Sequence, residues 1–372
     1  MAVIEVLATG IVFRGSADDG HFRNAHFPSV VELDGGRLVA AMDIGQRMTA
    51  RDVRSYCCRS DDGGQTWSRP RLIFEPDQSD HPVTTSCRIS RGPDGRLLGI
   101  AQLTDRSRPG EDLSNPQTDG STPGQLAVIQ SDDGGETWSG PTKINPPINW
   151  STWELCSVIL PLDADRWLLP TAIFPDWEGR SPLGVKALVM TSEDRGQSWP
   201  RSTDVFDFWD QKTTAWEQKQ TVLSDGRILA VCWCFNYATK QDEPNRYTLS
   251  HDHGATYGTA RDTPLQGQTC SILGLEDNHV LCVYRRLDKR GLWAHLARVE
   301  GDNWQPITDA VIWGTDVDAI AGGGDSSLRN LHKLQFGFPT LIRMASGDIF
   351  CVFWCVEDGL SVIRWYRLVV EM

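Results

Sequence analysis

The stretch SDDGGQTW, residues 60–67, has three further copies along this chain. SDDGGETW occupies residues 131–138, SEDRGQSW 192–199 and SHDHGATY 250–257, which gives the pattern S-x-D-x-G-x-[ST]-[WY] at intervals of roughly 60 to 70 residues. The Asp is expected to accept hydrogen bonds from backbone N–H groups of its own turn, and the Gly to supply a backbone angle that other residues resist. Four such turns in order indicate a β fold built from repeated units.

A second repeat lies between these turns. It consists of two apolar, β-branched segments joined by a turn that is often Asp-Gly, which is a strong hairpin signal. The six copies are Val30–Met42, Ile89–Ala101, Val158–Thr171, Thr221–Cys232, Ser271–Val283 and Thr340–Val352.

Six hairpin units predict six sheets of about four strands, and each sheet is too small to be stable alone. Radial packing around an axis buries their faces and protects their edges. The first apolar segment, Val3–Phe13, and the last, Ser361–Val370, are expected to complete one sheet together. We therefore predict an all-β, six-bladed β-propeller that forms a single domain over residues 1–372.

The composition limits the classes of partner. The formal net charge is −13, which argues against nucleic acid and against an anionic membrane surface, because both bind clustered Lys and Arg. An anionic small substrate stays possible, since it needs only a local basic pocket. The pattern gives no indication of oligomeric state.

The distribution of apolar residues and cysteines predicts the compartment. The N-terminal segment lacks the features of a secretory signal, and no apolar run reaches the length of about 18 residues that a transmembrane helix needs. Several of the ten cysteines fall inside expected strands, where they are predicted to be buried free thiols, and no CxxC pair suggests a structural zinc site. We expect a cytoplasmic protein without metal or cofactor.

The Asp-box turns and the hairpin repeat together resemble the sialidase (neuraminidase) superfamily, and the resemblance covers nearly the whole chain. It implies that the Asp boxes lie on the rim as structural clasps. It also implies that the active site lies on the axis, where the innermost strand of each blade begins and in the loops just after it.

The same resemblance assigns roles to particular positions. His26, in His-Phe-Pro, stands where the family has the first of three arginines that bind the substrate carboxylate. Asp52 is the best match to the catalytic Asp, and Asp43 is a weaker one. Glu217 matches the Glu that polarises the catalytic tyrosine. Trp233 stands at the second arginine.

In the sixth blade the third arginine and the tyrosine nucleophile fall near Phe336 and Phe353. Neither aromatic residue can perform those roles. The resemblance therefore implies the propeller fold without specificity for sialic acid.

Two expected inner strands begin alike, with Trp153-Glu154 and Trp216-Glu217. Equivalent positions in neighbouring blades direct both carboxylates toward one axial pocket. Two carboxylates on either side of a glycosidic bond are the general requirement for its hydrolysis, one as general acid and the other as nucleophile or base. The propeller family of exo-arabinanases, which is similar in fold, uses such a Glu pair. Both tryptophans suit stacking on a sugar face.

Further candidates come from the same inner-strand positions. Arg88 and Arg285 could bind a substrate carboxylate bidentately, and Tyr284 or Tyr237 could replace the nucleophile. The Gly-rich segment at residues 322–333, which contains Asp325 and His332, is predicted to be a loop over the pocket.

These patterns favour an exo-acting glycoside hydrolase on a non-sialic glycan, of uronate, arabinose or rhamnose type. The proposed catalytic residues are Glu217, Glu154, Asp52 and His26, and the proposed substrate-binding residues are Trp153, Trp216, Arg88, Trp233 and Arg285. Three alternatives stay open: a polysaccharide or oligosaccharide lyase with His26 or a Tyr as base, a non-catalytic carbohydrate-binding propeller, and an exo-sialidase with a rearranged site.

Overall fold

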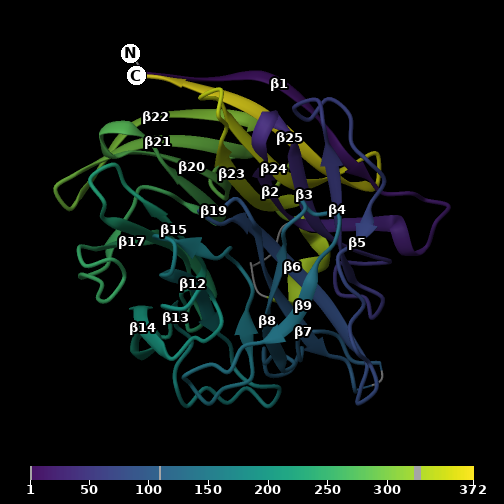
Figure 1. Cartoon of the computed structure of the whole chain (residues 1–372). Coiled ribbons are helices and arrows are strands. Elements are labelled where there is room, and N and C mark those ends of the chain that lie inside the picture. Colours follow the sequence, from purple (N-terminus) through teal and green to yellow (C-terminus); the bar gives the residue numbers. More distant parts are fainter. Residues whose placement is uncertain (1, 109, 322–327) are drawn as a thin grey trace.

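The computed structural model describes residues 2–108, 110–321 and 328–372. Within these residues the strands form six antiparallel sheets that stand around a common axis (Figure 1). The strands are β1 (Val3–Arg14), β2 (Asn24–Glu32), β3 (Leu38–Gly45), β4 (Arg54–Ser60), β5 (Arg71–Leu72), β6 (Val83–Arg91), β7 (Leu97–Asp105), β8 (Gly124–Ser131), β9 (Ser139–Lys143), β10 (Trp153–Glu154), β11 (Leu160–Pro161), β12 (Trp167–Ile173), β13 (Ala187–Ser192), β14 (Arg201–Phe206), β15 (Trp216–Val222), β16 (Ile228–Asn236), β17 (Gln241–Ser250), β18 (Arg261–Asp262), β19 (Gly267–Gly274), β20 (His279–Arg286), β21 (Leu292–Glu300), β22 (Asn303–Trp313), β23 (Phe336–Arg343), β24 (Ile349–Glu357) and β25 (Leu360–Glu371).

Short 3-10 helices lie in the connections. They are η1 (His21–Arg23), η2 (Asp34–Gly36), η3 (Trp209–Gln211), η4 (Glu276–Asn278) and η5 (Leu328–Lys333).

Each blade follows the chain from the axis outward. Blade one contains β2 to β5, blade two β6 to β9, blade three β10 to β14, blade four β15 to β18 and blade five β19 to β22. Blade six contains β23 to β25 and takes its outer strand from β1, which pairs antiparallel with β25 along nearly its whole length (Figure 1). This pairing of the two chain ends confirms the predicted closure and leaves the ring without an open end.

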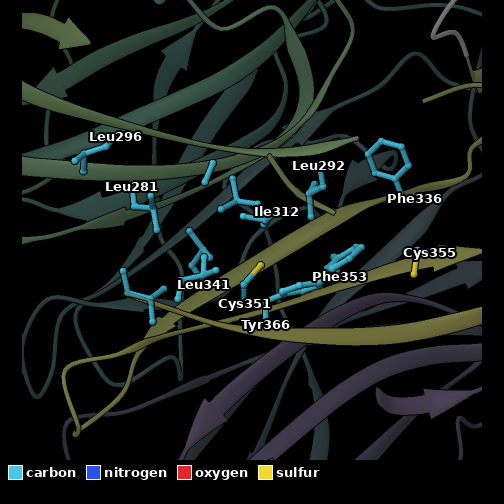
Figure 2. Packing of buried hydrophobic residues seen from close by; sticks show 14 of the residues in the cluster. Leu281, Leu292, Leu296, Ile312, Phe336, Leu341, Cys351, Phe353, Cys355 and Tyr366 are labelled. Atoms are coloured by element: carbon cyan, nitrogen blue, oxygen red, sulfur yellow. The ribbon is translucent and has the colours of Figure 1, made fainter. Parts of the chain in front are cut away.

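Apolar side chains on alternating strand positions hold neighbouring blades together. One cluster joins blades five and six, where Leu281 and Leu292 meet Cys351 and Phe353 (Figure 2). Equivalent clusters join blades six and one, one and two, two and three, three and four, and four and five. The core is therefore a ring of six interfaces between sheets, which is the predicted six-bladed propeller.

The Asp boxes connect the third and fourth strands of blades one to four. In the first box, Asp62 accepts hydrogen bonds from the backbone N–H of Thr66 at 2.9 Å and from its hydroxyl at 2.6 Å. The Ser60 hydroxyl donates to Asp62 at 2.8 Å and accepts from the buried N–H of Gly64, whose φ is 96°. The other three boxes repeat these bonds, as predicted. They are clasps within their own hairpins.

All ten cysteines are buried and unpaired, as predicted for the cysteines that lie in strands. In the described part of the chain, no helix is long and apolar enough to cross a membrane.

Candidate active site

Four inner strands of the described chain share one irregularity near the axis. β2, β15, β19 and β23 each contain a bulge, where the pairing register with the second strand of the blade shifts. A left-handed backbone is costly for residues other than Gly, and it persists where the surrounding structure holds it. One residue of each bulge has such a backbone, and these residues are Phe27, Glu217, Thr269 and Phe338, with φ angles of 54°, 48°, 51° and 50°.

The side chains of these four residues line one cavity on the axis, which we call the central cavity. The space within it, including the open space at its mouth, is about 580 Å³. Its remaining lining residues are Glu154, Phe174, Trp216, Trp233, Gln268, Arg285, Leu331, Leu334 and Trp354. The lining is thus largely aromatic, with a few convergent polar groups.

Glu154 and Glu217 meet at the wall of the central cavity. Glu154 ends the short strand β10, and Glu217 lies in the bulge of β15. The backbone N–H of Glu217 donates a hydrogen bond of 2.8 Å to Oε2 of Glu154. Oε2 of Glu217 is buried and has no hydrogen-bond partner in the described part of the chain. The expected convergence of these two carboxylates is therefore present in the structure.

The two carboxyl groups have different surroundings. Burial, reinforced by the negative charge of Glu217, raises the pKa of Glu154 to about 8. Glu154 is therefore mostly protonated at neutral pH. This arrangement places a proton donor beside the second cavity-lining carboxyl group, that of Glu217.

Lys219 is a charged neighbour that the sequence patterns did not reveal. It is nearly fully buried, and its ammonium lies 4.2 Å from the centre of the Phe338 ring. Among the described residues, the Lys219 ammonium makes no hydrogen bond or ion pair. Burial lowers the pKa of Lys219, while the charges of Glu217 and Glu154 act in the opposite direction. Its ammonium is attracted to the neighbouring Glu217 carboxylate.

Arg285 is the basic residue that lines the central cavity. Its guanidinium donates to Oε1 of Gln268 at 2.6 and 2.9 Å and to the carbonyl of Phe336 at 2.6 Å. Burial lowers the pKa of Arg285 to about 10, and the charges of Glu217 and Asp242 partly oppose this shift. Arg285 thus stays positively charged at neutral pH.

The predicted tryptophans differ in their access to ligand. Trp216 and Trp233 both line the central cavity, and the Trp233 indole donates 2.6 Å to Asp242. Trp216 is 1% exposed and stacks on Phe235, so it forms part of the cavity floor. Trp153 is also buried and lines an adjoining cavity beside Glu154.

His26 and Asp52 do not join the carboxylate pair. His26 lines a third cavity, which adjoins the central one at Leu331, Leu334 and Trp354. Burial lowers the pKa of His26 to about 3. Asp52 lines none of these cavities. It binds Nδ1 of His21 at 3.0 Å, and Nε2 of that ring lies 2.7 Å from the Tyr56 hydroxyl. This hydrogen-bonded chain holds Asp52 against blade one, away from the Glu pair.

The remaining candidates are buried. Arg88 lines the adjoining cavity and forms a buried ion pair of 2.9 Å with Asp43, and Tyr284 packs between blades four and five. Phe336 and Phe353 lie between blades five and six (Figure 2). The blade-six residues that reach the axis are instead Phe338 and Trp354.

Tyr237 packs on Trp216 outside the cavity lining. Asp325 lies outside the described residues. In the same predicted loop, Leu331 lines the central cavity and His332 lines the third. No group of three or more His, Cys, Asp or Glu in the described ranges could hold a metal ion.

Comparisons with known proteins agree with this architecture. The family model of the BNR repeat-like domain matches residues 36–351. A protein of unknown function from Dyadobacter fermentans is similar in structure, with 20% identity, 99% of each chain covered and a TM-score of 0.74.

Two enzymes also share the fold. The NanB sialidase of Streptococcus pneumoniae has 14% identity and a TM-score of 0.68, with 97% of this chain and 70% of that chain covered. An α-L-arabinofuranosidase from Fusarium graminearum has 12% identity and a TM-score of 0.66, with 97% of each chain covered. No curated protein sequence matches.

Proposed function

Because this chain belongs to the BNR repeat-like domain family and has the sialidase-type propeller fold, we propose that it is an exo-acting glycoside hydrolase on a non-sialic glycan. The observation that carries the proposal is the Glu154–Glu217 pair. It combines a carboxylic acid that is mostly protonated at neutral pH with a cavity-lining glutamate, Glu217, whose buried Oε2 has no hydrogen-bond partner among the described residues.

Two carboxyl groups with separated pKa values are what glycoside hydrolysis requires. Glu154 would donate its proton to the glycosidic oxygen as the bond to the leaving group breaks. Glu217 would attack the anomeric carbon, or would remove a proton from the water that attacks it. Lys219 and Arg285 both place positive charge near Glu217.

The shape of the central cavity supports action at a chain end. Its walls come from five blades, and Leu331 and Leu334 add to them from the segment before blade six. A cavity enclosed on so many sides receives a terminal sugar more readily than the middle of a polymer. Trp233 and the other aromatic side chains suit contact with the apolar face of a sugar ring.

The charges in the cavity argue against sialic acid as the substrate. Arg285 is the guanidinium that lines the central cavity, and it is already engaged with Gln268 and the carbonyl of Phe336. His26 and Trp233 occupy two of the positions where the family resemblance expects arginines. One such guanidinium does not reproduce a three-arginine clamp around a carboxylate. The structurally similar Fusarium enzyme, an arabinofuranosidase, illustrates a non-sialic activity on this fold.

The test uses a panel of aryl glycosides and oligosaccharides with wild-type protein, Glu217→Gln and Glu154→Gln. We expect release of a terminal sugar, and a loss of at least about 100-fold in kcat in each variant. The matched control is Glu300→Gln, which changes an exposed glutamate and leaves activity intact. Undiminished turnover by Glu217→Gln would contradict the proposal. Products that absorb as unsaturated uronates would indicate a lyase. Binding of a glycan without its turnover would indicate a carbohydrate-binding propeller.

A further inference from the structure

A second cavity adjoins the central one on the side of blades two and three. The two cavities share Phe27, Glu154, Phe174, Glu217, Leu331 and Phe338. Glu154 and Glu217 therefore lie at the junction of the two cavities. A glycosidic bond held between these carboxylates would have one sugar unit on each side of the junction.

The second cavity differs from the central one in its chemistry. Side-chain hydroxyl and amide groups from blade two and from the connection between β7 and β8 line much of it. The hydroxyls of Thr104, Ser114 and Ser121 make no hydrogen bond to any described residue, so they are free to bind a ligand. The polar residues are Ser86, Gln102, Thr104, Ser114, Ser121 and Thr122.

The connection that supplies part of this wall is braced against blade three. Ser114 and Ser121 pair as an isolated β-bridge, and the backbone N–H of Ser121 donates 3.0 Å to the carbonyl of Pro175. Asn115 and Thr118 donate 2.9 and 2.7 Å to the carbonyl of Trp177. These bonds hold the serine hydroxyls in place before a ligand binds, which lowers the entropic cost of recognition.

The charges of the second cavity are neutralised apart from the Glu pair. Arg88 is its basic lining residue, and Asp43 pairs with it at 2.9 Å in a fully buried position. The rings of Phe27 and Phe338 lie against the same guanidinium. Lys219 is buried and does not line this cavity, so an acidic sugar would find no unpaired cation among the described lining residues, whereas a neutral sugar would find several hydroxyl partners.

We propose, on the basis of the proposed hydrolase function, that the second cavity is the leaving-group subsite and that it binds a neutral, polyhydroxylated sugar unit. The central cavity then holds the terminal sugar, with the scissile bond at the junction. The substrate class is a glycan whose penultimate unit carries no carboxylate.

The experiment compares two leaving groups. The first substrate is a neutral disaccharide, namely whichever of arabinobiose, cellobiose and lactose the wild-type protein hydrolyses fastest. The second is an aryl monoglycoside of the same terminal sugar. We expect Thr104→Val and Ser114→Ala to lower kcat/KM for the disaccharide about tenfold each, since each removes a hydrogen bond to the leaving sugar. The leaving group of the aryl glycoside carries no sugar hydroxyls that could bind Thr104 or Ser114, so kcat/KM for this substrate stays within about twofold. Thr239→Val, in an exposed turn, is the control.

Three results would overturn the subsite: equal losses on both substrates, no loss on the disaccharide, or preference for a uronate-containing disaccharide. Thermal unfolding of each variant excludes a folding defect, and Ser121→Ala serves as the alternative variant.

If the wild-type protein cleaves no substrate, the hydrolase proposal fails while the subsite is still tested by calorimetric titration with the same neutral disaccharides. Binding that weakens about tenfold in Thr104→Val supports the subsite. Binding that is absent or unchanged overturns it.

Discussion

Replacing Glu154 by Gln should change how the stability of the propeller depends on pH. Burial raises the pKa of Glu154 from 4.5 to about 8 in the folded protein, so the folded state binds this proton more tightly than the unfolded state does. The contribution of Glu154 to the free energy of unfolding is therefore greatest below pH 4.5, and it is lost as the pH rises through about 8. At about 1.36 kcal/mol per pH unit, the loss reaches about 5 kcal/mol above pH 8 and about 3 kcal/mol at pH 7.

Glu154→Gln should abolish this loss, because its amide oxygen can still accept the hydrogen bond from the N–H of Glu217. The assay is denaturant unfolding of wild-type protein and variant at several pH values between 4 and 9. We expect the variant to gain free energy of unfolding relative to wild type as the pH rises. Glu300→Gln, which alters an exposed carboxyl, should follow the wild-type curve. If the unfolding free energies of wild type and Glu154→Gln change in parallel with pH, the assignment of a protonated Glu154 is refuted.

Three further changes separate the roles of other groups. Lys219→Met should lower kcat/KM, because Glu217 loses a nearby positive charge, and Lys219→Arg should restore it; undiminished kcat/KM in Lys219→Met would contradict this role. His26→Gln should leave the profile between pH 5 and 8 unchanged, because burial lowers the His26 pKa to about 3, and a lost limb in that range would show that His26 titrates there. Ser131→Ala should lower the unfolding free energy by about 1–3 kcal/mol without changing kcat, since the buried N–H of Gly135 loses its acceptor; an equal loss of kcat would contradict a purely structural Asp box.

The propeller could be predicted from the sequence because its signals are local. Each Asp box closes its own hairpin through bonds between residues four or fewer apart, so the residue pattern carries the structure directly. The Trp-Glu repeat was informative for a related reason, since blades that repeat in sequence place equivalent residues at equivalent points. Glu154 and Glu217 accordingly meet at the axis.

Other parts of the site depend on register and on distant contacts. Neighbouring residues in a strand point to opposite faces, so Phe353 is buried between blades while Trp354 faces the axis, and an error of one residue exchanges them. The bulges that present Phe27 and Glu217 have no sequence signature. Asp52 lies elsewhere because its carboxylate binds His21, a residue distant in the sequence. The place of Lys219 in the site depends on its contact with the Phe338 ring of another blade, which the sequence around Lys219 does not indicate.

The most direct test of Glu217 as the carboxylate that acts at the anomeric carbon is chemical rescue of Glu217→Ala. The variant is incubated with an aryl glycoside that the wild-type protein hydrolyses, with and without azide, and the products are identified by mass spectrometry. We expect the variant to lose hydrolysis and azide to restore release of the aryl group as a glycosyl azide forms, because a small anion replaces the missing carboxylate at the anomeric carbon. Hydrolysis at the wild-type rate without azide, or no glycosyl azide with it, would contradict the assignment of Glu217.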